Sequence, residues 1–247
     1  MNRITNFNNL ENRIVTWLSN YVIENPSIKS FVVGVSGGID SAVVSTLAAS
    51  TGLPTYALGM PIHQNPDQED LSDSHLDWLQ TNFSNVIVQK YNLTEVFETF
   101  KSTMKEFGFN THALANSRSR LRMVTLYQVA TSVDGIVVGT GNKVEDYGVG
   151  FYTKYGDGGV DIAPIADLYK TEVWELGKFL GVDSKIINAK PTDGLWDDGR
   201  TDEDQLGASY VELEEAMETG SGPGLDVLNK FRRMNQHKMN PIPTFKL

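Results

Sequence analysis

Residues 31–49 hold the feature that most limits what this chain can fold into. The run Phe31-Val32-Val33-Gly34-Val35 is short, apolar and rich in β-branched residues, which predicts a buried strand. A Ser-Gly-Gly loop follows it, and the apolar stretch 41–49 then predicts a helix. A buried strand that passes through a short loop into a helix is typical of a parallel sheet with helices packed on its faces.

The same alternation of strands and helices continues along the chain. Further strands are expected at 55–60, 86–88 and 135–140. Helices are expected at 8–24, around Leu71–Leu79, at 94–107, 113–133 and 170–181, and as two C-terminal helices divided by 220–224. The expected fold class is therefore α/β, a doubly wound parallel sheet with helices on both faces, in a single domain over 1–247.

The remaining stretches show no such periodicity. The chain becomes irregular and Gly-rich after Thr140, and 190–205 is polar and turn-rich. Doubly wound sheets bind ligands beyond the carboxyl ends of their strands. The loops after Val35, Met60 and Thr140 are therefore expected to form the site.

Composition excludes several classes of protein. The chain has 247 residues with no Cys, which excludes disulfides, Cys-ligated metal sites and a cysteine nucleophile. The net charge of −10 argues against a nucleic-acid partner. No apolar run reaches the length of a membrane span, so no membrane partner is expected. The N-terminus lacks the apolar segment of a signal peptide, so a cytoplasmic location is expected.

The segment 34–41 predicts a phosphate-binding loop. Its glycines let the backbone approach a ligand closely, and the helix that follows presents free N–H groups and the positive end of its dipole. Neither G-x-x-x-x-G-K-[ST] nor G-x-G-x-x-G occurs in the chain, which excludes the two common phosphate loops. A carboxylate at Asp40 would repel phosphate unless a cation lay between them, and this favours Mg²⁺.

Longer stretches carry a family resemblance. The segment SGGIDS resembles the loop of the ATP-pyrophosphatases, whose fold is the adenine nucleotide alpha hydrolase-like sheet. From about residue 10 to 240 the chain resembles the ammonia-dependent NAD synthetases specifically. The matching stretches are GVSGGIDS, NSRSRLRM, GTGNKVED, FYTKYGDGGVDIAPIADLYK, KPTDGLW and HKM.

The resemblance implies a ligase acting in the last step of NAD biosynthesis. ATP would adenylate the carboxylate of deamido-NAD with release of pyrophosphate, and ammonia would then displace AMP to give NAD. The implied ATP-binding residues are Gly34, Val35, Ser36, Gly37, Gly38, Ile39, Asp40, Ser41, Thr140, Lys170 and Thr192. The implied deamido-NAD-binding residues are Arg120, Lys154, Asp161, His237 and Lys238. Asp40 and Glu145 would bind Mg²⁺, and the family forms homodimers.

Two departures from the family pattern leave points open. Ser119 stands where many relatives have Ala. The spacer between Glu145 and Lys154 is one residue longer than in some relatives, so Asp146 remains an alternative to Glu145 as the metal ligand.

Two polar segments are also open to more than one interpretation. Arg118 and Arg122 share a helical face while Arg120 lies about 200° away, so the three cannot all serve one site. The segment from Lys190 to Asp204, which includes Gly194, Trp196 and Gly199, is a candidate lid over a reactive anhydride or a plain surface loop.

The absence of Cys also bears on the nitrogen donor. Glutamine-dependent relatives carry an additional amidase domain with a Cys nucleophile, which this chain cannot provide, so free ammonia is the expected donor. No general base is assigned, and no histidine outside the HKM motif receives a role. The alternative functions are another adenylating enzyme of the same loop class, such as a GMP synthetase domain or a tRNA-modifying enzyme, and a non-catalytic nucleotide sensor.

Overall fold

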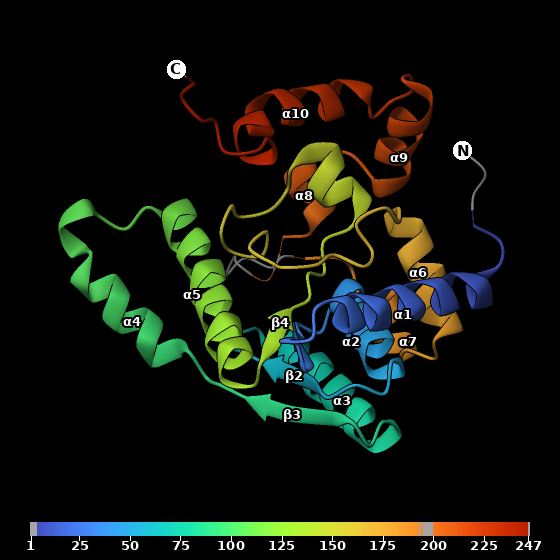
Figure 1. The fold of residues 1–247 in the computed structure, drawn as a ribbon. Helices are drawn as coiled ribbons and strands as arrows, with labels where there is room; N and C mark the ends of the chain where they lie inside the picture. The colour runs from blue at the N-terminus through green and yellow to red at the C-terminus, as the bar shows by residue number, and fades with distance from the viewer. Residues whose placement is uncertain (1–3, 193, 195–199, 247) are drawn as a thin grey trace.

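The computed structural model describes residues 4–192, 194 and 200–246. Four parallel strands form the sheet in the order β3-β2-β1-β4 (Figure 1). The strands are β1 Ser30–Gly34, β2 Thr55–Gly59, β3 Val86–Lys90 and β4 Gly135–Val137. Each overlaps its expected range, and the doubly wound parallel sheet is confirmed. The strand β4 is shorter than the expected strand 135–140: its pairing with β1 ends at Val137, and Val138, whose amide still donates to the Val32 carbonyl, forms a single parallel bridge with Ile162.

Helices pack on both faces of the sheet. They are α1 Phe7–Glu24, α2 Ile39–Ser50, α3 Pro66–Asn82, α4 Thr94–Thr103, α5 Thr111–Ser132, α6 Lys170–Phe179, α7 Ser184–Asn188, α8 Asp202–Leu206, α9 Tyr210–Thr219 and α10 Leu225–Met239, with a 3₁₀ turn η1 at Lys105–Phe107 and a π-helix η2 at Lys143–Val149. The expected helix 94–107 is thus divided between α4 and η1. The stretch after Thr140, expected to be irregular, contains η2.

Alternating side chains of the strands build the two faces. Phe31 and Val33 of β1 point to the face covered by α1, α2 and α6. Val32 points to the opposite face, where it packs with Ala130 of α5. Within the part of the chain that the structure describes, no helix is long and apolar enough to cross a membrane.

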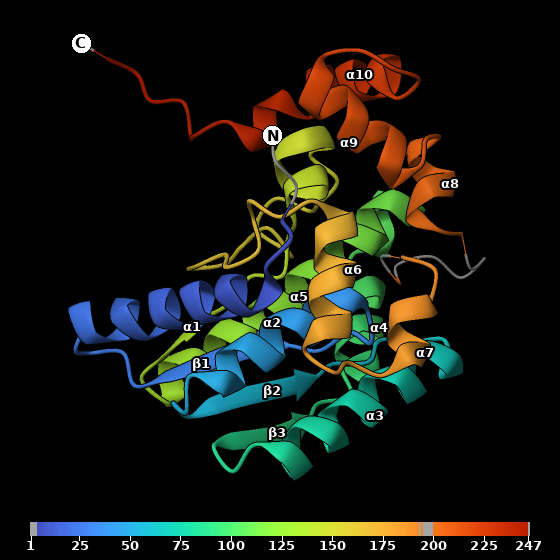
Figure 2. The same cartoon turned by 90° about the vertical axis from the view of Figure 1, so that its right-hand side faces the viewer.

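A separate apolar cluster joins the C-terminal helices to η2. It includes Val144, Tyr210, Leu213 and Leu228, all buried. Figures 1 and 2 show α8, α9, α10 and η2 together above the sheet, on the side of the loops that follow β1 and β4. Since chain order reverses at β1, with β2 on one side and β4 on the other, these two loops flank the switch point where such sheets bind ligands.

Candidate nucleotide-binding site

The loop between β1 and α2 is stabilised by hydrogen bonds to one of its own serine hydroxyl groups. The Ser36 amide donates to Ser41 Oγ over 3.2 Å, and Ser41 Oγ donates to the Gly38 carbonyl over 2.9 Å. Gly37 has φ +88°, and a Cβ there would lie 2.7 Å from the Gln68 carbonyl oxygen. Only glycine fits that position. Helix α2 begins at Ile39 with no side-chain cap, so its first N–H groups face the loop as an anion-binding end.

A buried lysine lies between two carboxylates beside this loop. Lys170 Nζ lies 2.5 Å from Asp40 Oδ2 and 2.9 Å from Glu145 Oε1. The Lys170 residue is 2% exposed. The three side chains come from α2, η2 and α6, which meet above the carboxyl edge of the sheet. Lys170 is 130 residues from Asp40 and 25 residues from Glu145 in the sequence, and the fold brings the three side chains into one cluster.

Asn142 and Tyr210 complete the cluster. Asn142 Nδ2 donates to Asp40 Oδ1 over 3.1 Å, while its Oδ1 caps η2 by accepting from the amides of Val144 and Glu145. The Tyr210 hydroxyl lies 2.6 Å from Glu145 Oε1 and 3.1 Å from a carboxylate oxygen of Asp202. The loop after β4 and the C-terminal helices therefore fix the carboxylates from two sides.

The carboxylates and the lysine perturb each other's protonation. Burial raises the pKa of Asp40, and the charge of Glu145 adds to that effect against the opposing pull of Lys170. Burial also acts to raise the pKa of Glu145, but Lys170 and the Tyr210 hydroxyl outweigh it, and the pKa is lowered. Burial disfavours the charged form of Lys170, yet the surrounding carboxylates keep its pKa above the ordinary value.

Asp146 differs from its neighbour Glu145. Burial, with the nearby charges of Glu145, Asp157 and Asp40, raises the pKa of Asp146 to about 8. Its carboxylate packs against the backbone of Gly141, where an added Cβ would overlap Asp146 Oδ2. Glu145, in contrast, shares Lys170 with Asp40.

The donor set suits Mg²⁺. Within residues 4–192, 194 and 200–246, no three His, Cys, Asp or Glu side chains are grouped as a self-sufficient metal site. Mg²⁺ is usually held by one or two carboxylates together with substrate phosphates and water. Asp40 and Glu145, which meet at Lys170 beside an anion-binding loop, are a pair of that kind.

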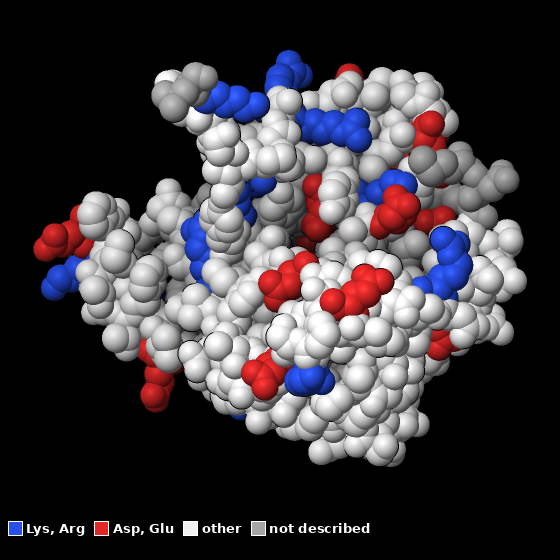
Figure 3. All heavy atoms as spheres, viewed as in Figure 1, with Lys and Arg blue, Asp and Glu red and all other residues white. Residues whose placement is uncertain are grey.

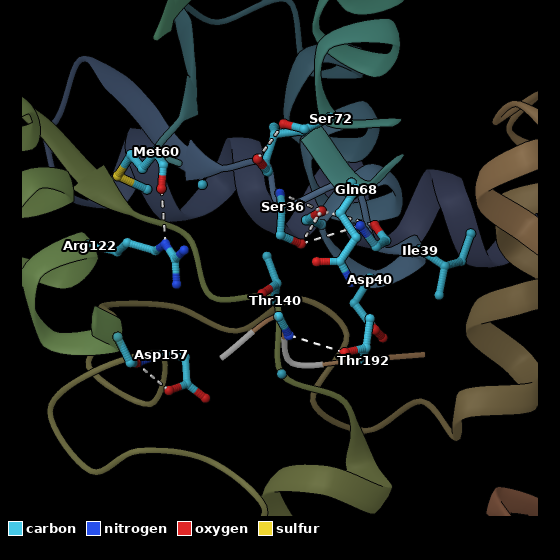
Figure 4. Close-up of a pocket in the computed structure, with 18 of the residues that line it drawn as sticks. Ser36, Ile39, Asp40, Met60, Gln68, Ser72, Arg122, Thr140, Asp157 and Thr192 are labelled. Atoms are coloured by element: carbon cyan, nitrogen blue, oxygen red, sulfur yellow. Dashed lines mark hydrogen bonds between the residues drawn. The ribbon is translucent and has the colours of Figure 1, made fainter. Parts of the chain in front are cut away.

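These groups line a cleft of about 310 Å³. All eight residues of the loop 34–41 line it, as do Thr140, Glu145, Lys170 and Thr192. Figure 4 shows Ser36, Asp40 and Gln68 across the cleft from Arg122 and Asp157. The structure thus brings every expected ATP-binding residue into one cavity. In Figure 3 the hollow opens below the C-terminal helices, with basic side chains over α5 and acidic ones near its centre.

The residues expected to bind deamido-NAD lie outside the lining of this cleft. Arg120 is exposed on α5 and donates to the Lys154 carbonyl at 3.3 and 3.4 Å. Lys238 Nζ donates to the Tyr152 carbonyl over 2.6 Å from the opposite side. Arg120, Lys154 and Lys238 thus meet around one loop, residues 151–161.

Asp161 and His237 are placed differently from those three. The Asp161 carboxylate accepts from the Val137 amide and from the Tyr127 hydroxyl, which ties the end of loop 151–161 to the sheet. His237 is exposed near the end of α10.

The three arginines of α5 separate as their spacing predicts. Arg118 lies over the Phe97 ring at 5.0 Å. Arg122 lines the cleft, with Nε donating to the Met60 carbonyl over 3.0 Å and a terminal nitrogen donating to Gln64 Oε1 over 3.1 Å. Arg122 is not among the residues expected at the site from the sequence. The sequence feature that could have identified Arg122 is its position in the matching stretch NSRSRLRM. It follows Arg120 by two residues and therefore lies about 200° around the helix from it.

The expected lid lies partly outside the described residues. Residues 193 and 195–199, which include Trp196 and Gly199, are not described. Of the remainder, Thr192 Oγ1 donates to the Arg200 carbonyl over 3.2 Å, and a short helix, α8, begins at Asp202 where a turn-rich segment was expected.

Comparison with known proteins agrees with this architecture. The family model described as NAD synthase matches residues 10–242. The NH(3)-dependent NAD(+) synthetase of Carboxydothermus hydrogenoformans is 39% identical over 233 residues, 92% of each chain. The solved structure of NMN synthetase from Francisella tularensis superposes with a TM-score of 0.91 at 34% identity, over 99% of this chain and all of that one.

A more distant structure shows the fold alone. The NH3-dependent NAD synthetase from Campylobacter jejuni superposes with a TM-score of 0.80 at 24% identity, over 98% of this chain and all of that one. With a family model that matches nearly the whole chain and a relative of 39% identity over most of its length, the chain belongs to the NAD synthase family.

Proposed function

We propose that the protein uses ATP and ammonia to convert deamido-NAD into NAD, AMP and pyrophosphate. The observation that carries the proposal is the position of Lys170. It is buried between Glu145 and Asp40, of which Asp40 lies in the first turn of α2, and all three side chains line the cleft of the phosphate-binding loop. Relatives that share the family are named NH(3)-dependent NAD(+) synthetases. The chain has no Cys, so it lacks the nucleophile that glutamine-dependent relatives use.

The site chemistry supports an adenylation step. The substrate carboxylate attacks the α-phosphorus of ATP, the bond to the β,γ-phosphates breaks, and pyrophosphate leaves. The loop 34–41 and the N-terminus of α2 donate N–H groups to the phosphates, and Lys170 provides a buried positive charge for the leaving group. Mg²⁺, held by Asp40 and Glu145, would offset the charge of the phosphates when bound.

Amide formation follows on the acyl adenylate. Ammonia attacks the acyl carbon, AMP leaves with the bonding electrons, and the ammonium nitrogen loses a proton to give the amide. Since neutral ammonia is the nucleophile, we expect the rate at fixed total ammonium to rise from pH 7 to 8.5. A flat or falling rate over this range would contradict free ammonia as the attacking species. The acyl adenylate must be kept from water, a role we propose for the segment 190–204.

One incubation tests the reaction. The protein is mixed with ATP, Mg²⁺, deamido-NAD and ammonium chloride, and NAD, AMP and pyrophosphate are quantified, with a parallel sample in which glutamine replaces ammonium. Equal amounts of the three products from ammonium alone support the proposal. If none of the samples consumes ATP, the proposal is contradicted and a nucleotide sensor is favoured. In the variants Asp40→Ala and Glu145→Ala, an enzyme loses turnover while the protein stays folded.

A second candidate substrate is nicotinate mononucleotide. The observation that favours it is the superposition on an NMN synthetase with a TM-score of 0.91 over essentially the whole of both chains. The chemistry at the carboxylate would be the same, because the two substrates share the nicotinate end. The same assay with nicotinate mononucleotide in place of deamido-NAD decides between them, and the ratio of kcat/KM for the two identifies the substrate.

We also propose that the protein is a homodimer. Large apolar side chains are exposed where α4 and the start of α5 stand away from the body of the molecule (Figure 1). They are Val96, Phe100, Met104, Phe107 and Phe109. Groups of neighbouring exposed apolar side chains are typical of protein interfaces. Sedimentation of the protein tests the assembly, and Phe107→Asp should shift it toward monomer if this surface is the interface.

A further inference from the structure

Ser119 joins α5 to loop 151–161 by two hydrogen bonds. Its Oγ donates to Asp157 Oδ1 over 2.6 Å and accepts from the Asp157 amide over 2.8 Å. Asp157 Oδ1 also accepts from the Thr153 amide over 3.0 Å. Ser119 is 6% exposed, so water competes little for these bonds. The hydroxyl therefore closes the loop upon itself and onto the helix.

The loop is shaped around this hydroxyl. A Cβ at Gly156 would overlap Ser119 Oγ, so the space next to the hydroxyl exists because position 156 has no side chain. Tyr155 has φ +60°, a conformation that costs free energy in a non-glycine residue and persists only where the surroundings enforce it. One turn earlier on α5, Asn116 Oδ1 accepts from Thr153 Oγ1 over 2.6 Å. Two side chains on one helical face thus hold a strained turn.

The loop held in this way touches both groups of candidate site residues. Ser119, Gly156 and Asp157 line the cleft that contains the phosphate-binding loop. The next residues outward are Lys154, whose carbonyl accepts from Arg120, and Tyr152, whose carbonyl accepts from Lys238. If the loop moved away from α5, the wall of the cleft and the alignment of these basic side chains would change together.

We propose that Ser119 is a positioning residue for the carboxylate substrate. By holding Asp157, it fixes loop 151–161 as the wall against which the nicotinate-bearing substrate lies, while the ATP phosphates are held by the opposite wall at 34–41. This inference rests on the proposed function. It assigns to Ser119 an effect on the binding of the nicotinate nucleotide and none on the binding of ATP.

The test is Ser119→Ala with Ser117→Ala as the matched control. Ser117 lies on the same helix, and its hydroxyl donates to the Ala113 carbonyl of its own helix over 2.9 Å. In Ser119→Ala we expect the KM for the nicotinate nucleotide to rise about tenfold, which corresponds to about 1.4 kcal/mol. The kcat and the KM for ATP should stay within about twofold of wild type, and Ser117→Ala should leave all three constants unchanged.

A double-mutant cycle and a ligand-free measurement complete the test. Asp157→Ala already removes the carboxylate that accepts from Ser119 and leaves only the bond from its backbone amide, so adding Ser119→Ala to it should raise the KM by less than Ser119→Ala does in the wild-type protein. In the ligand-free protein, amide hydrogen exchange should become faster in 151–161 of Ser119→Ala and stay unchanged in 34–41.

The possible failures are distinguishable. Equal changes in kcat and in both KM values would overturn the positioning role, as would no change in any of them. Unchanged exchange in loop 151–161 would show that Ser119 does not hold it. Absence of turnover by the wild-type protein with both nicotinate nucleotides would instead overturn the proposed function, and with it the assignment of the substrate.

Discussion

Lys170→Met should destabilise the protein in a strongly pH-dependent way. The substitution keeps much of the volume of the side chain and removes the positive charge that faces both Asp40 and Glu145 at 2.5 and 2.9 Å. Removing one partner of a buried ion pair costs about 3–5 kcal/mol. The two carboxylates would then be left to repel each other, and the least costly relief is for one of them to take up a proton.

The cost of that proton sets the magnitude. A carboxyl group with an ordinary pKa of about 4 is protonated at pH 7 at a cost of about 1.4 kcal/mol for each of three pH units, or about 4 kcal/mol. At pH 5 only one unit remains, about 1.4 kcal/mol. In the variant the folded-state pKa of this carboxyl is raised above its unfolded value. Its folded state is therefore least penalised at low pH and loses stability as the pH rises, so the deficit relative to wild type should shrink by about 2.7 kcal/mol from pH 7 to pH 5.

Urea unfolding followed by tryptophan fluorescence measures the free energy of unfolding at both pH values. Lys178→Met is the matched control, because Lys178 pairs with Glu175 at the surface, with the two side chains 54% and 52% exposed, and should lose less than about 1 kcal/mol. Adding Glu145→Gln to Lys170→Met should restore part of the stability. A deficit in Lys170→Met that is equal at pH 5 and pH 7 would refute the reasoning, since it would show a loss of packing rather than of charge compensation.

Three other changes test single features of the fold. Burial lowers the pKa of His75 to about 4, so the wild-type protein should lose up to about 3 kcal/mol of stability as the pH falls from 6.5 toward 4, and His75→Leu should lack this part of the pH dependence of urea unfolding. Gly37→Ala should abolish detectable ATP binding in titration calorimetry, because its Cβ would lie 2.7 and 2.9 Å from backbone atoms. The control Gly52→Ala is also at positive φ but has open space around it, so it should cost only about 1 kcal/mol of stability and leave ATP binding intact. Tyr210→Phe removes a hydroxyl bonded to two carboxylates and should cost about 1–3 kcal/mol in urea unfolding, whereas the exposed Tyr147→Phe should be neutral; equal losses in the two tyrosine variants would argue against a role for the buried hydroxyl.

The half of the candidate site around residues 34–41 could be predicted because these residues follow from local sequence. A buried strand must end before a helix begins, and in a parallel sheet the ends of β1 and β4 meet at one edge. Residues 34–41 and the loop that begins at Thr140 were therefore expected at the same edge of the sheet, however the helices packed. Glu145, Lys170 and Thr192 came from the family resemblance, since nothing in their local sequence places them there.

Short elements and distant partners escaped prediction for physical reasons. Helices α7 and α8 have five residues each, too few for apolar periodicity, and each begins with a side-chain cap, from Asp183 and Thr201. Tyr210 is 65 residues from Glu145, and their contact depends on how the C-terminal helices pack over η2. That packing is set by an apolar cluster whose partners no local pattern identifies.

For the arginines of α5, the sequence motif and the structure provide different information. Spacing alone separates Arg120 from Arg118 and Arg122, but it does not say which face meets the cleft. The structure places Arg122 on the cleft and Arg120 against the backbone of loop 151–161. Arg120 thus lies beside a loop that Ser119 joins to α5 through Asp157. A family motif that names Arg120 thus predicts a ligand contact, while the structure shows the backbone of loop 151–161 as the partner of this side chain.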